Sequence, residues 1–132
     1  MFLENYWYCA ALTHEVGAKP LRRIICDEPV VLYRNVRGGP VALEDRCSHR
    51  QAPLSTGEVC GDEIQCIYHG FVFNQLGICV HIPHQSTIPN RANIKAYQVE
   101  EKWGFIWIWR GDAKKANSDM IPDLPWTRDA KR

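Results

Sequence analysis

Two short segments, each combining a cysteine with a histidine, constrain this chain more than any other feature of its sequence. The first is Cys47-Ser48-His49 and the second is Cys66-Ile67-Tyr68-His69, and residues 50–65 separate them. Each segment follows a strand-like run. Gly70 comes directly after the second segment and suits a sharp turn, because glycine tolerates a positive φ. A fold that uses these side chains together must bring two loop tips together at the ends of neighbouring strands.

In the rest of the chain, apolar and polar residues alternate over short runs that turn-forming residues interrupt, as in short strands. Nine Gly and eight Pro are spread along the sequence, where they end one short run and begin the next. No stretch carries apolar residues at the spacing of one helix face. The predicted strands cover residues 6–12, 21–26, 30–34, 41–44, 64–66, 71–73, 78–80, 93–100 and 103–109. A turn is expected at 27–29, and the run 103–109 is apolar on both faces, which predicts burial on both sides. The fold class predicted is all-β, a small sandwich or barrel.

Composition bounds the possible functions. A chain of 132 residues and 15.2 kDa forms one domain, and 45% hydrophobic with 23% charged residues excludes wholesale disorder. A net charge of +1 supplies no field for binding nucleic acid, and no apolar run is long enough to span a membrane. The start of the chain does not resemble a secretion signal, so a reducing cytoplasm is expected. Six cysteines there are metal ligands or core residues rather than disulfides.

Two kinds of metal site are compatible with the paired segments. Zinc binds Cys₂His₂ sets, but usually with both cysteines in one segment and both histidines in the other. Here each segment mixes the two residue types, which a single zinc ion does not require. A binuclear iron–sulfur centre uses the mixture directly, since both loops give Cys to one iron and His to the other.

The pattern C-x-H, a gap of 16 residues, C-x-x-H and a following glycine resembles the Rieske family. Further segments are similar to the N-terminal part of a Rieske non-heme iron oxygenase of the vanillate O-demethylase type. They are Asn5-Tyr6-Trp7-Tyr8, Glu44-Asp45-Arg46-Cys47, Tyr68-His69-Gly70, Gly104-Phe105-Ile106-Trp107-Ile108-Trp109 and Ile121-Pro122-Asp123-Leu124-Pro125. The resemblance implies a Rieske-type β-sandwich with two cluster-binding loops. It also implies one [2Fe–2S] cluster held by Cys47, His49, Cys66 and His69.

The resemblance also implies the function and the partners. One electron at a time would pass through the cluster, in the service of an oxygenase that hydroxylates or O-demethylates an aromatic compound. Electrons would come from a reductase that uses a flavin and NAD(P)H, or from a ferredoxin. They would go to a mononuclear iron in a downstream domain that this chain lacks, in a parent protein that is a homotrimer. No catalytic iron site is expected within the chain itself.

The ligand set also bears on the redox potential. The oxidised centre is neutral, because two thiolates balance the charge of the ferric ions and sulfides, whereas a four-cysteine cluster is already an anion before reduction. Rieske potentials therefore lie higher, at about −150 to +300 mV. High-potential relatives carry a disulfide between the ligand loops and hydroxyl donors after the second His. Here Tyr68 stands at the disulfide position and Phe71 and Phe73 replace the hydroxyls, which predicts the low end of the range.

Two other functions stay open beside the oxygenase domain. One is a complete Rieske ferredoxin that carries electrons without a substrate of its own, and the other is a structural zinc domain. The domain boundaries predicted are 1–112 for the Rieske domain and 113–132 for a polar, proline-containing tail that begins a linker to the absent catalytic domain. That tail favours the oxygenase over the free carrier.

Several other residues have a simpler interpretation. Four further cysteines, Cys9, Cys26, Cys60 and Cys79, are predicted to be buried core residues. The pair His81 and His84 surrounds a proline and has no nearby carboxylate, so an ordinary loop is expected there. Arg46 and Arg50 flank the first ligand segment and are expected to be solvated or ion-paired, with contact to an acidic redox partner as the alternative.

Overall fold

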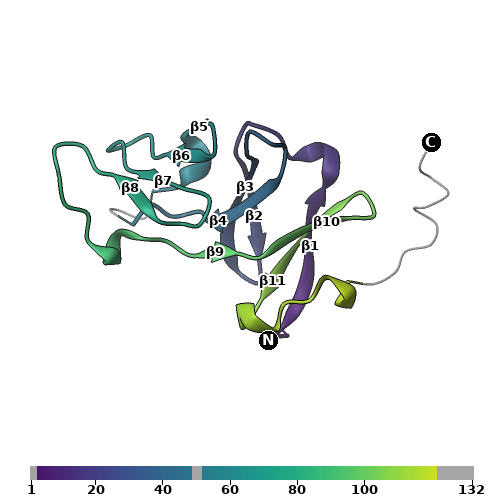
Figure 1. Ribbon diagram of the computed structural model, residues 1–132. Coiled ribbons are helices and arrows are strands. Elements are labelled where there is room, and N and C mark those ends of the chain that lie inside the picture. Colours follow the sequence, from purple (N-terminus) through teal and green to yellow (C-terminus); the bar gives the residue numbers. More distant parts are fainter. Residues whose placement is uncertain (1–2, 49–51, 122–132) are drawn as a thin grey trace.

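A computed structural model of the chain describes residues 3–48 and 52–121. All its strand pairs are antiparallel, and they form three sheets. Sheet A has the strand order β1-β11-β10, sheet B has β2-β3-β4-β9, and sheet C has β5-β6-β7-β8. In Figure 1, sheet C lies at the opposite end of the molecule from β1. The all-β prediction is confirmed.

The strands are β1 (Tyr6–Leu12), β2 (Leu21–Ile25), β3 (Glu28–Arg34), β4 (Pro40–Glu44), β5 (Glu58–Cys60), β6 (Glu63–Gln65), β7 (Val72–Phe73), β8 (Cys79–His81), β9 (Ala96–Tyr97), β10 (Val99–Lys102) and β11 (Phe105–Arg110). The 3₁₀ turns are η1 (Thr13–Glu15), η2 (Leu54–Thr56), η3 (Asn90–Ala92), η4 (Ala113–Lys115) and η5 (Ser118–Met120). In the described ranges, no helix is long and apolar enough to cross a membrane.

Strand β3 explains how three sheets share one small domain. Its five consecutive buried residues, Pro29 to Tyr33, form a continuous apolar run of the kind found in strands that are covered on both faces. Val30 and Leu32 pack into the core between sheets A and B, together with Ile106 and Ile108 of β11. The alternate residues Val31 and Tyr33 pack into a second core on the other face of sheet B. Sheet C covers that second core, so the ligand loops are anchored to the middle of the domain.

Strand β11 is also buried on both faces, as its sequence predicts. Ile106 and Ile108 face the core between sheets A and B, while Trp107 and Trp109 lie in a third cluster with Trp7. Ile121, only 3% exposed, packs into this third cluster. The segment after β11 therefore folds back onto sheet A, at least as far as Ile121.

The guanidinium group of Arg34 forms hydrogen bonds to β10 and to the loop before β2. Its two terminal nitrogens donate to the Glu101 carboxylate on β10 at 3.0 and 2.7 Å, and Nε donates to the Val16 carbonyl at 2.8 Å. These hydrogen bonds from Arg34 lower the pKa of the Glu101 carboxyl below its usual value. The pair therefore stays ionised at neutral pH and links sheet B to sheet A.

Several local predictions from the sequence are wrong. Trp103 and Gly104 lie in the turn between β10 and β11 rather than in a strand, and the predicted strand 93–100 is divided between β9 and β10. The first hairpin turns at Cys26 and Asp27, with φ values of +52° and +64°, rather than at 27–29, and Pro29 lies inside β3. A two-residue turn with positive φ at both positions matches the twist of the flanking strands, and Pro29 cannot adopt a positive φ. Strand β5 (Glu58–Cys60) has no counterpart among the predicted strands, because three residues are too few to show an alternating pattern.

Candidate metal centre

The two cysteines of the paired segments lie together in the core under sheet C. Cys47 follows β4 and Cys66 follows β6, and their exposed fractions are only 1% and 2%. Both belong to the same cluster of buried side chains as Phe71 and Phe73. The structure therefore brings two thiols from distant segments into one apolar environment, as the sequence predicts for a shared metal centre.

The two ligand loops are closed in the same way. The Cys47 N–H donates to the Ala52 carbonyl at 2.7 Å, and the Cys66 N–H donates to the Phe71 carbonyl at 2.8 Å. Each bond joins a cysteine to the residue five positions later. Each cysteine thus sits at the base of a loop that a backbone hydrogen bond of the same span closes.

The second loop carries its histidine to the surface. Gly70 has a φ of +74° and its N–H donates to the Cys66 carbonyl at 3.1 Å, so the expected sharp turn is present. His69 is exposed, as are its neighbours Ile67 and Tyr68, at 63% and 66%. The loop therefore keeps its thiol inside and its imidazole outside. His49 of the first loop lies outside the described residues.

The backbone at Gly57, after the first ligand loop, lies very close to the backbone at Gln65, just before the second. An added Cβ at Gly57 would lie 1.9 Å from the Gln65 carbonyl oxygen, the residue before Cys66. Only glycine allows the chain leaving the first loop to pass so near the chain entering the second. By contrast, a Cβ at Gly17 meets nothing within 4 Å.

We expect Gly57→Ala to separate the two loops and to destabilise the domain by about 2–3 kcal/mol, since the clash is with backbone rather than with a flexible side chain. Gly17→Ala is the matched control and should be close to neutral. Thermal unfolding of both variants, together with their iron content, checks this. Equal stability of the two variants would show that the approach at Gly57 is not required.

A buried carboxylate, missed by the sequence analysis, anchors the first loop from below. Asp45 is 1% exposed and accepts three hydrogen bonds, all at 2.7 Å: from Arg22 Nη1, from the Ser55 hydroxyl and from the Ser55 N–H. Its own N–H donates to the Pro29 carbonyl at 3.0 Å. Because Asp45 precedes Cys47 and Ser55 follows the loop in η2, one side chain holds both ends of the loop. The sequence shows Asp45 beside the ligand, but nothing in it signals burial.

The remaining candidates occupy ordinary positions. The prediction that four further cysteines are buried is wrong for most of them: Cys79 is buried, Cys26 is half-buried, and Cys9 and Cys60 are exposed. Burial raises the pKa of the Cys79 thiol, which therefore stays protonated. His81 ends β8 and is exposed, as is His84. Cys9 and Cys60 lie on short or irregular strands, where alternation alone does not decide which face is covered.

The flanking arginines differ in what the structure shows of them. Arg46 is partly exposed and pairs with Glu44 across 3.6 Å, so the expected ion pair is present. Arg50 lies outside the described residues. Within 3–48 and 52–121, no three His, Cys, Asp or Glu side chains gather closely enough to hold a metal ion.

The donors present fit a Rieske cluster. Two thiols lie in a buried apolar site, where thiolates need positive iron to offset their charge, and one imidazole lies at the adjacent surface. That division into an inner sulfur side and an outer nitrogen side is what unequal ligation of two irons requires.

Comparison with known proteins agrees with this arrangement. The sequence model of the Rieske [2Fe–2S] domain matches residues 6–98. The chain is 49% identical over 127 residues to the toluene-4-sulfonate monooxygenase system iron–sulfur subunit of Comamonas testosteroni, covering 96% of this chain and 37% of that protein. It is 46% identical over 124 residues to the oxygenase component of dicamba O-demethylase from Stenotrophomonas maltophilia, covering 93% of this chain and 37% of that protein.

A solved structure extends the agreement to three dimensions. The crystal structure of dicamba monooxygenase superposes with a TM-score of 0.90 at 44% identity, over 97% of this chain and 41% of that one. The chain thus spans about two-fifths or less of the relatives that it matches. These matches favour the iron–sulfur interpretation over a zinc domain. By sequence and by fold, the chain belongs to the Rieske [2Fe–2S] domain family.

Proposed function

We propose that this chain carries single electrons through a [2Fe–2S] cluster held by Cys47, His49, Cys66 and His69. The observation that carries the proposal is the placement of two buried cysteines at the bases of two equally closed loops. When bound, the cluster supplies a one-electron redox couple. The residues of the chain hold the thiolates away from water and present the His69 imidazole at the surface, where a partner protein can approach it.

We further propose that the acceptor is the mononuclear iron of an oxygenase that acts on an aromatic compound. Relatives named for toluene-4-sulfonate, dicamba and vanillate support this, since they are subunits or components of such oxygenases. The electron donor would be a reductase that uses a flavin and NAD(P)H, or a ferredoxin, and the full-length parent would be a trimer. A free Rieske ferredoxin remains the alternative.

The proposed domain boundary falls after residue 112, with 113–132 beginning the linker to the catalytic domain. The Asp112 side chain accepts a hydrogen bond from the Lys114 N–H and so begins η4. The Trp7 indole N–H donates to the Asn117 carbonyl at 2.9 Å, and Ile121 packs beside Trp107. These contacts support a linker whose first residues are held against sheet A.

The surroundings of the two cysteines favour a low reduction potential. Phe71 and Phe73 are 9% and 0% exposed and pack in the same cluster as Cys47 and Cys66. Neither ring offers a hydroxyl donor, so the extra negative charge that the cluster gains on reduction is less stabilised than in a site with such donors. We expect a midpoint nearer to about −150 mV than to +300 mV.

A spectroelectrochemical titration of the anaerobically purified chain tests both proposals. We expect uptake of one electron per chain, full reoxidation in the reverse scan, and a midpoint at the low end of the Rieske range. A strongly positive midpoint would contradict the account of Phe71 and Phe73 but leave electron transfer standing. Absence of any reversible one-electron couple would contradict the proposed function itself.

A further inference from the structure

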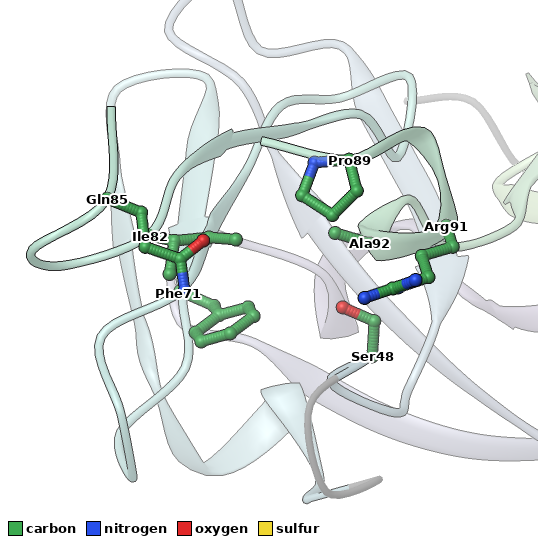
Figure 2. Close-up of a pocket in the computed structure, with 7 residues that line it drawn as sticks. All are labelled: Ser48, Phe71, Ile82, Gln85, Pro89, Arg91 and Ala92. Atoms are coloured by element: carbon green, nitrogen blue, oxygen red, sulfur yellow. The ribbon is translucent and has the colours of Figure 1, made fainter. Parts of the chain in front are cut away.

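A small polar-rimmed pocket lies beside the two ligand loops. Its volume is about 260 Å³, and its lining includes Ser48, Phe71, Ile82, Gln85, Arg91 and Ala92 (Figure 2). Ser48 stands between Cys47 and His49 in the first loop, and Phe71 closes the second loop through its carbonyl. Both ligand loops therefore contribute directly to the wall of this pocket.

The rim of the pocket carries donors without partners. The Ser48 hydroxyl is buried and has no hydrogen-bond partner among the described residues. In that same part of the chain, Arg91 is exposed and takes part in none of the ion pairs. Figure 2 shows the Ser48 hydroxyl and the Arg91 guanidinium pointing toward one another, with Gln85 reaching in from the opposite side.

The floor of the pocket is apolar. Phe71, Ile82 and Ala92 are all buried, at 9%, 5% and 7% exposed. Small-molecule sites usually occupy about 300–1,000 Å³, so this pocket suits a single side chain better than an aromatic substrate. A carboxylate on a short hydrocarbon stem matches both parts: the stem contacts the floor, and the oxygens accept from the guanidinium fork and the hydroxyl.

We propose that this pocket receives an acidic side chain, Asp or Glu, from the protein that delivers electrons to the cluster. The inference rests on the proposed function, because it assumes a cluster between the two loops. A carboxylate seated between Ser48 and Arg91 holds the donor protein against both ligand loops. Arg91 is then a docking residue that fixes the orientation of the partner and has no part in the redox chemistry itself.

Arg91→Glu tests the proposal, with Arg37→Glu as the matched control. Arg37 is also exposed and makes the same change in net charge, and it lies in the turn between β3 and β4. In that turn, the Val36 N–H donates to the Asp62 carboxylate. Asp62 is at the end of the β5–β6 hairpin opposite the ligand loops, so Arg37 lies on the side away from those loops. The probe is a chemically reduced plant-type [2Fe–2S] ferredoxin, an acidic protein whose potential of about −400 mV makes the transfer downhill.

In stopped-flow mixing at low ionic strength, we expect Arg91→Glu to lower the second-order rate constant by about tenfold or more. Arg37→Glu should change it by less than about twofold, and both should keep the wild-type midpoint potential. Equal slowing by the two variants would show only a general field effect and overturn the proposal. No slowing by Arg91→Glu would overturn it as well.

Arg91→Lys separates capture of a carboxylate from simple attraction. Lysine keeps the charge but loses the two-pronged geometry of the guanidinium, so we expect a rate at least about twofold below wild type. A wild-type rate for Arg91→Lys would overturn the pocket as a binding site. Failure of the proposed function would be seen separately, as the lack of a reversible couple before any partner is added.

Discussion

Replacement of Cys66 by Ser should leave the chain without a [2Fe–2S] cluster. Cys66 is 2% exposed at the base of the second loop, and a serine hydroxyl at that place is a far poorer ligand for iron than a thiolate. We expect the purified variant to lack visible absorption and to contain less than about a tenth of the wild-type iron. Cys47→Ser should behave in the same way, because the two loops are closed alike.

Cys60→Ser is the matched control for this experiment. Cys60 ends β5 in the same sheet and six positions before Cys66, yet it is exposed. It should keep the full iron content and colour. If Cys66→Ser retained a wild-type content of iron while Cys60→Ser lost it, the ligand assignment would be wrong. Circular dichroism of each variant shows whether loss of iron is accompanied by loss of the β-structure.

Asp45→Asn should destabilise the domain by loosening the first ligand loop. The change weakens hydrogen bonds from Arg22 and from both donors of Ser55, and it places an amide group against one of those donors. Losing charge-assisted bonds in a buried site costs about 2–4 kcal/mol. Arg22 is itself 43% exposed and can be hydrated, which keeps the cost below that of a fully buried pair.

Glu15→Gln provides the comparison for Asp45→Asn. Glu15 pairs with Arg23, the neighbour of Arg22 on β2, across 3.1 Å, but both partners are partly exposed. Such a pair contributes less than about 1 kcal/mol. Thermal unfolding at one fixed scan rate should therefore show a decrease in Tm of about 5 °C or more for Asp45→Asn, and little change for Glu15→Gln. Similar Tm values for the two variants would contradict the role of Asp45 in holding the first loop.

The sequence predicts most of the strands because their burial follows from the local pattern of apolar residues. Strand β1 has the expected bounds, and β11 shows the expected burial on both faces, since four large residues in succession can be accommodated only between two cores. Strand β3 is covered on both faces for the same reason. These features depend on residues close together in the chain, which is why they can be predicted without a structure.

Other features depend on contacts between distant residues and cannot be predicted in this way. Cys9 lies on the same face of β1 as the buried Trp7, because the β-bulge comes after it, but the cluster around Trp7 does not include Cys9, which is exposed. The burial of Asp45 depends on Arg22 and Ser55, which lie 23 and 10 positions away. Charged residues are seldom buried unless they are paired, so without knowledge of the pairing the prediction favours the surface.

The candidate site shows the same division. The spacing of the two paired segments predicts the four ligands, because iron chemistry limits which side chains can share a cluster. The closeness of the loops depends on the missing side chain at Gly57 and on the carbonyl of Gln65, a contact that spacing does not reveal. The pocket at Arg91 is assembled from three separate stretches of chain and has no signature in the sequence.

Electron–nuclear double resonance on the reduced protein, grown with ¹⁵N-labelled histidine, tests the central claim most directly. If imidazole nitrogens of both loops bind one iron of the cluster, the spectrum will contain two strongly coupled ¹⁵N nuclei, and His69→Cys will leave one. A reduced cluster with no coupled histidine nitrogen, or a single coupled nitrogen that persists in His69→Cys, would contradict the ligation on which the proposed electron transfer depends.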